Sequence, residues 1–519
     1  MTGWSLLAAV AALSTVGGIT WAFSRGRSST PGGYFLAGRS LTAPLIAGSL
    51  LLTNISTEQL VGLAGSAYAT NLSSMAWEVT AGVACIVMAL WLLPRYLAGG
   101  FTTLPEFLAS RYDSRVRRAS ALLFLLGYAV ITLPSVLYSG SLAVMLLTDA
   151  TQWSGVSETT TLFFTILVIA GIGGAFAIAG GLRAVAVSDT LFGIGLLAIG
   201  AMIPILGLVT LGSGSLLHGW QQLLLNAPEK LNAIGGSDAP TPIATVFTGM
   251  LLANLFYWGT NQYVVQRTLA ARSLAAGQIG VLVSGFFKVL VPFFVMLPGI
   301  IAWLLYGPHL ASMDMAYPTL VRNVLPAWLQ GLFLAVVIGV VASSFNSLVN
   351  SAATLLSRDF GHTSAHAVRT ARWQSVGIIA LSIVIAPQLA EAGEGLWQVI
   401  RRFTGFYNIP VVTLVLVALL RRGGNPVAAL WVMVGHIVVY GLVTFGMDTG
   451  LHFIHWYAIL FAVEAAILLL VPRVDRAAPD AAPPAVDLTP WRYRYPAAAL
   501  LVLAMLATYA LFSPIGIAQ

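Results

Sequence analysis

Long apolar runs constrain this chain more than any other feature of its sequence. A helix needs about 20 mostly apolar residues to cross the hydrocarbon core of a bilayer. Only 8% of the residues are charged, whereas a typical soluble domain is about a quarter charged. We therefore predict an all-α polytopic membrane protein and exclude a soluble enzyme, a disordered chain and a disulfide scaffold. The fourteen predicted spans are residues 4–23, 42–69, 73–97, 118–147, 160–180, 184–212, 242–270, 275–306, 327–356, 373–391, 393–420, 425–447, 451–472 and 494–514.

The basic residues predict the orientation of these spans. With the N-terminus outside, 20 of the 25 Lys and Arg residues fall in inner loops, Arg267 among them, and only Lys230 and Arg322 fall in outer loops. Cytoplasmic loops are enriched in Lys and Arg. We therefore predict that both termini lie outside, in a multi-pass protein of the cell inner membrane.

The sequence offers little support for a nucleic-acid partner, a disulfide, a metal site, an enzyme or a sensor. The net charge is +7, but no block of basic residues with interleaved aromatics favours nucleic acid. The single cysteine, Cys85, excludes an intrachain disulfide and a multi-thiolate metal site. His452 and His455 lack a third ligand nearby, so we expect no metal site there. The seven histidines are scattered and offer no catalytic pair with an acid, so we expect no enzyme. No obligate protein partner is evident, and a sensor would need an added cytoplasmic domain, which we do not find.

Two apolar segments are interrupted by polar residues at corresponding places in two halves of the chain. They are residues 49–65 and residues 253–266. Paired interruptions of this kind indicate an inverted-repeat transporter with a site near the bilayer midplane, although a helix that is wet at one end would look similar. The predicted organisation is an N-terminal helix and loop (1–41), a first repeat (42–212), an outer loop (213–241), a second repeat (242–420) and three accessory helices (421–519). A Pro/Ala-rich cytoplasmic linker at 475–490 joins the last two of these helices.

Few ionisable residues fall inside the spans, and such residues are functional candidates because a charge in hydrocarbon is unfavourable. Lys288 needs a polar cavity or an acidic partner such as Glu78 or Glu58, so an internal brace and a binding role stay open. Glu464 lies outside the repeats, where a helix contact is favoured. The full set is Glu58, Glu78, Asp189, Lys288, Arg401, Arg402 and Glu464.

Residues 340–359 are rich in hydroxyls and amides within one span. Ser343 and Ser347 share a helix face, with Ser344 beside them. Hydroxyls and free carbonyls could bind sodium, because small hard cations prefer oxygen ligands. Small-residue helix packing is the alternative. We also predict a cytoplasmic interfacial helix over residues 101–118, and a tight Gly180–Gly181 turn before the span that carries Asp189.

Seven segments, in order along the chain, together resemble the sodium/solute symporter family, in the branch of the sodium/glucose and sodium/galactose cotransporters. The resemblance implies a LeuT-type core of five plus five inverted repeats that works by alternating access. The segments are GGYFLAGRSL (32–41), TNISTEQLVGLAGSAY (53–68), TTLPEFLASRY (102–112), IAGGLRAVAVSDT (178–190), NLFYWGTNQYVVQRTLAARSL (254–274), KVLVPFFVMLPGI (288–300) and FNSLVNSAATLLSRD (345–359).

The resemblance also implies roles for individual residues. Sugar hydroxyls would be held by Gln59, Glu78, Asn254 and Lys288, and Tyr257 would be the inner-gate tyrosine. The outer-gate aromatics look like Trp77 and Trp397. Sodium would be bound by carbonyls of Leu52, Ile55 and Val340 and by the hydroxyls of Ser343 and Ser344, with Asp189 as nearby support.

The chain departs from the sugar-transporting relatives at three places. Ala81 replaces a sugar-contacting serine, and Asn346 replaces a serine of a second sodium site. Arg401 replaces a sugar-binding glutamine, and an arginine can form a forked pair with a carboxylate or sulfonate. We therefore expect sodium-coupled uptake of a hexose such as glucose or galactose, and the alternative is uptake of an acidic sugar or similar anion anchored by Arg401.

Overall fold

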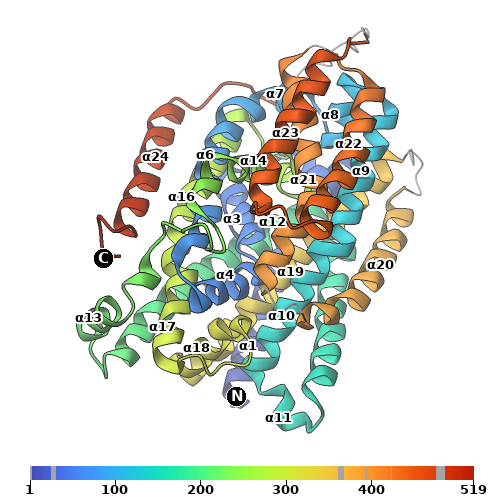
Figure 1. Cartoon of the computed structure of the whole chain (residues 1–519). Coiled ribbons are helices and arrows are strands. Elements are labelled where there is room, and N and C mark those ends of the chain that lie inside the picture. Colours follow the sequence, from blue (N-terminus) through green and yellow to red (C-terminus); the bar gives the residue numbers. More distant parts are fainter. Residues whose placement is uncertain are drawn as a thin grey trace.

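The computed structural model describes residues 3–24, 31–360, 367–391, 395–421, 423–474 and 486–518. Nearly all of the described chain is helical, and Figure 1 shows the helices packed side by side in one bundle with α24 at its margin. The N-terminal half contains α1 (Gly3–Ser24), α2 (Pro31–Leu36), α3 (Ala43–Asn54), α4 (Thr57–Ala69), α5 (Ala76–Val79), α6 (Ala81–Val87), α7 (Leu93–Gly99), α8 (Leu104–Arg111), α9 (Ser114–Gly127), α10 (Leu133–Thr148), α11 (Ala150–Ser154), α12 (Glu158–Leu211) and α13 (Leu216–Asn226).

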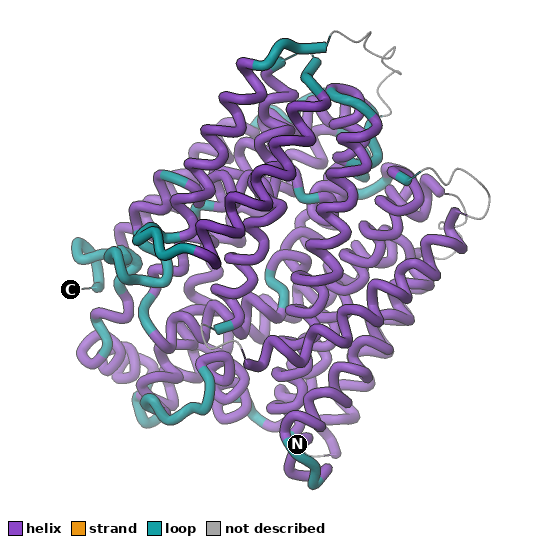
Figure 2. The backbone as a smooth tube through the Cα atoms, turned by 45° about the vertical axis from the view of Figure 1, so that its right-hand side comes forward, coloured by secondary structure: helices purple, strands orange, loops and turns teal. Residues whose placement is uncertain are grey.

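The C-terminal half continues in the same way, and Figure 2 shows that short loops join the helices. It contains α14 (Gly249–Leu255), α15 (Gln262–Leu269), α16 (Leu274–Val291), α17 (Leu297–Tyr306), α18 (Ala316–Val324), α19 (Ala327–Asp359), α20 (Ala367–Ile385), α21 (Leu396–Leu420), α22 (Pro426–Gly441), α23 (Phe453–Leu470) and α24 (Arg494–Leu511).

Eleven helices in the described part of the chain are long and apolar enough to cross a membrane. The fourteen predicted spans include three more segments, and two of these are the interrupted ones. The first breaks between α3 and α4, where Ile55 has φ −82° and ψ 72°. The second passes from α14 through a π-helical turn, Phe256–Thr260, to the extended residue Asn261 before α15. Both predicted interruptions are confirmed.

The remaining segment belongs to α12. The sequence predicts two spans, 160–180 and 184–212, joined by a turn at Gly180–Gly181, and the structure carries both stretches in a single helical element, α12, from Glu158 to Leu211. The sequence is apolar on both sides of the two glycines, so no polar loop separates the two halves.

Contacts with α19 nevertheless show that the two halves of α12 run in opposite directions. Gly173 lies against Phe345, whereas Phe192 lies against Gly339. Nineteen residues of a straight helix would separate Gly173 from Phe192 by about 28 Å, but their two partners on α19 are separated by only about 9 Å. The axis of α12 must therefore reverse between these points, and both halves pack on α19.

The prediction for residues 101–118 needs correction. The interfacial helix predicted over 101–118 is two helices, because α8 ends at Arg111 and Asp113 caps α9 by accepting from the N–H groups of Arg115 and Val116. Burial acts to raise the pKa of Asp113, but these N–H groups and the Arg115 side chain outweigh it and hold the pKa below its usual value. Most of the predicted linker, residues 475–485, lies outside the described residues.

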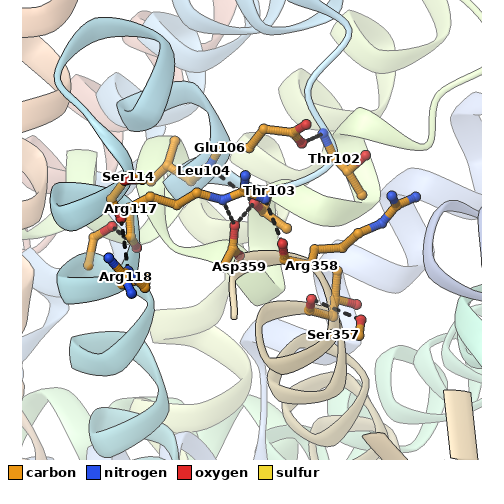
Figure 3. Close-up of polar contacts among 12 residues, drawn as sticks. Thr102, Thr103, Leu104, Glu106, Ser114, Arg117, Arg118, Ser357, Arg358 and Asp359 are labelled. Carbon is orange, nitrogen blue, oxygen red and sulfur yellow. Dashed lines mark hydrogen bonds and ion pairs between the residues drawn. The ribbon is translucent and has the colours of Figure 1, made fainter. Parts of the chain in front are cut away.

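An ion pair joins α9 to the end of α19. Arg117 Nε lies 2.6 Å from Asp359 Oδ1, and Arg117 also donates to the Arg358 carbonyl at 2.7 Å. Thr103 Oγ1, at the start of α8, donates to the same Asp359 oxygen at 3.0 Å. Figure 3 shows these side chains converging on Asp359. Three segments far apart in the sequence are thus tied together at one end of the bundle.

Candidate solute and sodium site

The break between α3 and α4 opens onto a cavity inside the bundle. Its walls come from the two interrupted segments and from α21, with Trp77 of α5 and Thr132 completing them, so both predicted interruptions line one cavity. Five of the predicted solute and gate residues line it: Gln59, Trp77, Tyr257, Trp397 and Arg401. The other lining residues are Asn54, Glu58, Thr132, Ala253, Phe256, Asn261, Tyr263, Ile400, Thr404, Tyr407 and Asn408.

Arg401 lies between the two predicted gate tryptophans. Its guanidinium carbon is 4.7 Å from the ring centre of Trp77 and 3.9 Å from that of Trp397. The two indoles also meet edge to face, with ring centres 6.4 Å apart. A guanidinium over an indole face is stabilised by the ring quadrupole, and both tryptophans are buried. These three side chains therefore close one side of the cavity.

Several polar atoms around the cavity have no hydrogen-bond partner within the described residues. The acceptors among them are Glu58 Oε2, Gln59 Oε1 and Asn408 Oδ1. The donors are Arg401 Nε and the indole nitrogens of Trp77 and Trp397. Buried polar groups are normally hydrogen-bonded. A mixed set of free donors and acceptors between aromatic walls fits a solute with several hydroxyl groups, since a hydroxyl both donates and accepts.

Three predicted sugar contacts do not line the cavity, because they are engaged behind it. Lys288 donates to Glu78 and to Asn54, and Gln59 donates to Glu78 at 3.2 Å. The Lys288 and Glu78 side chains are only 3% and 1% exposed. Asn254 donates to the Thr80 hydroxyl at 2.9 Å. The structure thus gives Lys288 the acidic partner that a brace requires, one layer behind Gln59 and Asn54.

The predicted sodium residues lie on or directly after α3 and on α12 and α19, three helices that pack against one another. Ser343 and Ser344 are buried on α19, and neither hydroxyl has a hydrogen-bond partner in the described part of the chain. Leu52 lies in the last turn of α3 and Ile55 directly after it, where helix carbonyls lack intrahelical partners. Val340 is one turn before Ser344 in the uninterrupted α19. Such hydroxyls and carbonyls are the oxygen ligands that a small hard cation prefers.

Asp189 joins this cluster through its neighbours. Ser49, on α3, donates to Asp189 Oδ2 at 2.6 Å. The other carboxylate oxygen, Oδ1, has no hydrogen-bond partner among the described residues. Asp189 therefore links α12 to α3 through one oxygen, and its carboxyl group also lies near Ser343.

Arg267 is a functional candidate that the sequence reasoning missed. It was predicted to lie in an inner loop, but its side chain is 1% exposed and its Nη2 lies 3.6 Å from Asp189 Oδ2. It also donates to Ser49 at 2.7 Å, to Ser347 and to the Tyr263 carbonyl. The second interruption turns the chain inward here, which brings α15 into the core. The local sequence QYVVQRTL does not reveal this burial, because all eight residues of α15 are buried, the polar ones included.

Aromatic rings line the side of the cavity where the two interruptions meet. Tyr257 and Tyr263 meet edge to face with ring centres 5.9 Å apart. The Tyr257 hydroxyl donates to the Thr53 carbonyl at 3.5 Å. This contact spans from the second interruption to the first.

Comparison with known proteins gives a consistent result. Residues 34–435 match the model of the Sodium:solute symporter family. The chain is 41% identical over 508 residues to the "Uncharacterized symporter YidK" of Escherichia coli (strain K12), covering 96% of this chain and 88% of that protein. It is 30% identical over 430 residues to the sodium/glucose cotransporter of Vibrio parahaemolyticus, covering 76% of each chain.

Solved structures show a similar fold. A sodium-coupled sialic acid symporter in a substrate-bound outward-open state matches with a TM-score of 0.76 and 18% identity, over 91% of this chain and 99% of that chain. A transporter of the nucleobase-cation-symport-1 family matches with a TM-score of 0.53 and 15% identity, over 85% and 97% of the two chains.

Proposed function

The chain belongs to the sodium:solute symporter family, and from this premise we propose that it imports a hexose by coupling uptake to inward sodium movement. It is a multi-pass membrane protein, its solute is a small molecule, and sodium is the coupling ion. The neutral sugar, the inner-membrane location, the predicted orientation and the individual residue roles are our proposals.

One observation supports the sugar most: donors and acceptors without partners among the described residues both line a cavity with aromatic walls. Trp77, Trp397 and Tyr257 offer flat faces to the apolar side of a pyranose ring. Glu58 and Gln59 offer acceptors to its hydroxyls. Because Glu58 faces the same cavity as Arg401, the lining has no large excess of either charge.

The proposed coupling follows from where the two ligands would bind. Sodium at Ser343 and Ser344 would join α19 to the end of α3, and α3 ends at the cavity. Solute at Gln59 would contact the start of α4, across the same break. Each ligand would then stabilise the same arrangement of α3, α4 and α19. Two ligands that favour one state of a common equilibrium increase each other's affinity.

The test is uptake of radiolabelled glucose and galactose by proteoliposomes that contain the purified protein. An inward sodium gradient should drive accumulation, and replacing external sodium by choline should abolish it. Sugar uptake that is equally fast in choline would refute the coupling, and no uptake of either hexose would refute the proposed solute.

A second candidate is an acidic sugar, and Arg401 favours it. Its Nε has no partner among the described residues, and a guanidinium can bind a carboxylate through two parallel hydrogen bonds. The sialic acid symporter of similar fold is a precedent for a solute of this class.

Substituting Arg401→Gln distinguishes the two candidates, because the new amide can still donate to a hydroxyl but carries no charge. Hexose uptake should survive the change with a modest rise in KM, whereas uptake of an acidic sugar should be lost. Arg402→Gln is the matched control, since Arg402 neighbours Arg401 on α21 but does not line the cavity.

A further inference from the structure

Two tyrosines from the accessory helices bind the turn of α21 that carries Arg401. Tyr457, on α23, donates from its hydroxyl to the Arg401 carbonyl at 2.6 Å. Tyr440, on α22, donates to the Arg402 carbonyl at 2.7 Å. Both tyrosine side chains are buried. Helices that lie outside the two predicted repeats therefore hold the backbone at Arg401, the arginine that lines the cavity.

His436 makes the third contact with the same stretch of α21. Its Nε2 lies 2.9 Å from the Gly405 carbonyl, and its Nδ1 lies 2.5 Å from Glu464 Oε1 on α23. The close approach depends on Gly405, because a Cβ there would meet the Tyr440 ring at 2.2 Å. His436 and Glu464 are both buried.

The two contacts of His436 can form together only if the His436–Glu464 pair carries an additional proton. A carbonyl oxygen only accepts, so Nε2 must donate its hydrogen to Gly405. If the imidazole is neutral, Nδ1 is then an acceptor and Glu464 must carry a proton to donate to it. If Glu464 is ionised, Nδ1 must carry the proton instead. In either form, the pair holds one proton more than a neutral imidazole beside a carboxylate.

The surroundings favour keeping that proton. Glu464 Oε2 has no hydrogen-bond partner within the described chain, so an ionised Glu464 beside a neutral imidazole would be a buried and uncompensated charge. The Tyr440 ring stacks on the imidazole, with ring centres 5.5 Å apart at 12°.

The other ionisable groups nearby are accounted for. Tyr457 lies on α23, and Arg402 on α21 extends over Phe453 with a distance of 5.8 Å to its ring. The remaining helix against α22 is α9, whose charged residues lie in its first two turns, where Arg117 pairs with Asp359. Glu464 is thus the acidic residue that faces His436.

We propose that His436 and Glu464 form a proton-binding site that positions α21, and with it the cavity arginine. With the proton bound, both hydrogen bonds of the imidazole form. Without the proton, His436 has one N–H for two acceptors and must release either Gly405 or Glu464. Loss of the proton would loosen the Arg401 turn, so the site makes the cavity sensitive to pH. The effect on transport rests on the proposed function, whereas proton binding itself does not.

The decisive variant is Glu464→Gln. Its amide can donate to Nδ1 of a neutral imidazole, which leaves Nε2 free to donate to Gly405, so both hydrogen bonds persist at every pH. The readout is hydrogen–deuterium exchange of the α21 segment 401–409 in the full-length protein in nanodiscs, from about pH 5 to about pH 8, the interval in which an ordinary histidine side chain changes its charge.

After correction for the intrinsic pH dependence of exchange, the wild-type segment should exchange about fivefold faster at the alkaline end, which corresponds to one lost hydrogen bond. Glu464→Gln should show no such excess, and Asp448→Asn, at an exposed acid in the α22–α23 loop, should match the wild type. If Glu464→Gln does not fold, His436→Gln serves in its place and should also lack the excess.

An equal pH response of the wild type and Glu464→Gln would overturn the proposal. Uptake gives an independent arm: with labelled glucose as the probe, the wild-type KM should rise about fivefold over the same range while the KM of Glu464→Gln stays constant. Absence of glucose uptake in both proteins would count against the proposed function alone, because the exchange result would still decide the proton site.

Discussion

The buried pair of Lys288 and Glu78 allows a quantitative test of how the cavity is supported. Substituting Lys288→Met removes the ammonium group and keeps an unbranched side chain of similar length. Glu78, 1% exposed, would keep only the Gln59 amide as a donor. Removing one partner of a buried ion pair typically destabilises a protein by about 3–5 kcal/mol, because the other charge stays buried without compensation.

The double substitution separates this charge effect from the loss of packing. Glu78→Gln alone leaves the Lys288 ammonium with Asn54 as its remaining partner, so it should also be strongly destabilising. Lys288→Met combined with Glu78→Gln leaves no buried charge, and the new amide can still pair with Gln59. We expect the double variant to be more stable than the sum of the single effects predicts, by about 3 kcal/mol.

The assay is chemical denaturation of the purified protein in a mild detergent, which gives the free energy of unfolding of each variant. Lys230→Met is the matched control: Lys230 lies in the loop after α13 and donates to the Tyr68 and Thr70 carbonyls, and its loss should have a much smaller effect. Additive effects of the two single substitutions would refute the reasoning, since they would mean that neither residue depends on the other's charge.

Three further predictions concern the rest of the bundle. Ser343→Ala and Ser344→Ala should each raise the sodium concentration for half-maximal uptake about tenfold through loss of one ligand. Ser382→Ala, at a buried serine on α20, should not change it. An unchanged sodium requirement in the first two variants would show that these serines do not bind sodium. Burial raises the pKa of Asp314 to about 6, although the Leu396 N–H opposes this. Between about pH 4 and about pH 6 the folded protein therefore holds a proton that the unfolded chain has lost. The free energy of unfolding should fall by about 3 kcal/mol as the pH rises through this interval. Asp314→Asn should abolish that fall, as measured by unfolding midpoints at several pH values. Arg117→Ala should lower the free energy of unfolding by about 1–3 kcal/mol, because Asp359 loses its cationic partner; equal losses for Arg118→Ala, which is exposed and donates only to its own helix, would show that the ion pair contributes nothing.

The sequence was sufficient for the features that depend on local pattern. The two helix interruptions lie where polar residues break apolar runs, and Gln59, Trp77, Tyr257, Trp397 and Arg401 meet at one cavity. The family resemblance supplied the spacing between distant segments. It could not show that Glu78 and Lys288 are turned away from the cavity, because that depends on which partner each side chain finds.

Other features depend on contacts between helices and left no local signal. Arg267 looks like an ordinary inner-loop arginine, yet α15 carries it into the core beside Asp189. The sequence predicted a turn at Gly180–Gly181, but it did not show that both halves of α12 pack on α19. The pairing of His436 with Glu464 joins residues 28 positions apart on two accessory helices, and neither residue has a neighbour in the sequence that indicates the other.

The pairing of Asp189 with Arg267 has a consequence for the energetics of transport. Because the carboxylate is already balanced by a buried guanidinium, an arriving sodium ion would add a full positive charge to that region rather than neutralise a negative one. A carrier loaded with sodium and a neutral sugar would then be more positive than the empty one by one charge per ion. A membrane potential of 100 mV acts on each such charge with about 2.3 kcal/mol. Under these conditions the voltage would act on the step that moves the loaded carrier, whereas the empty carrier would return without a net charge from this pair.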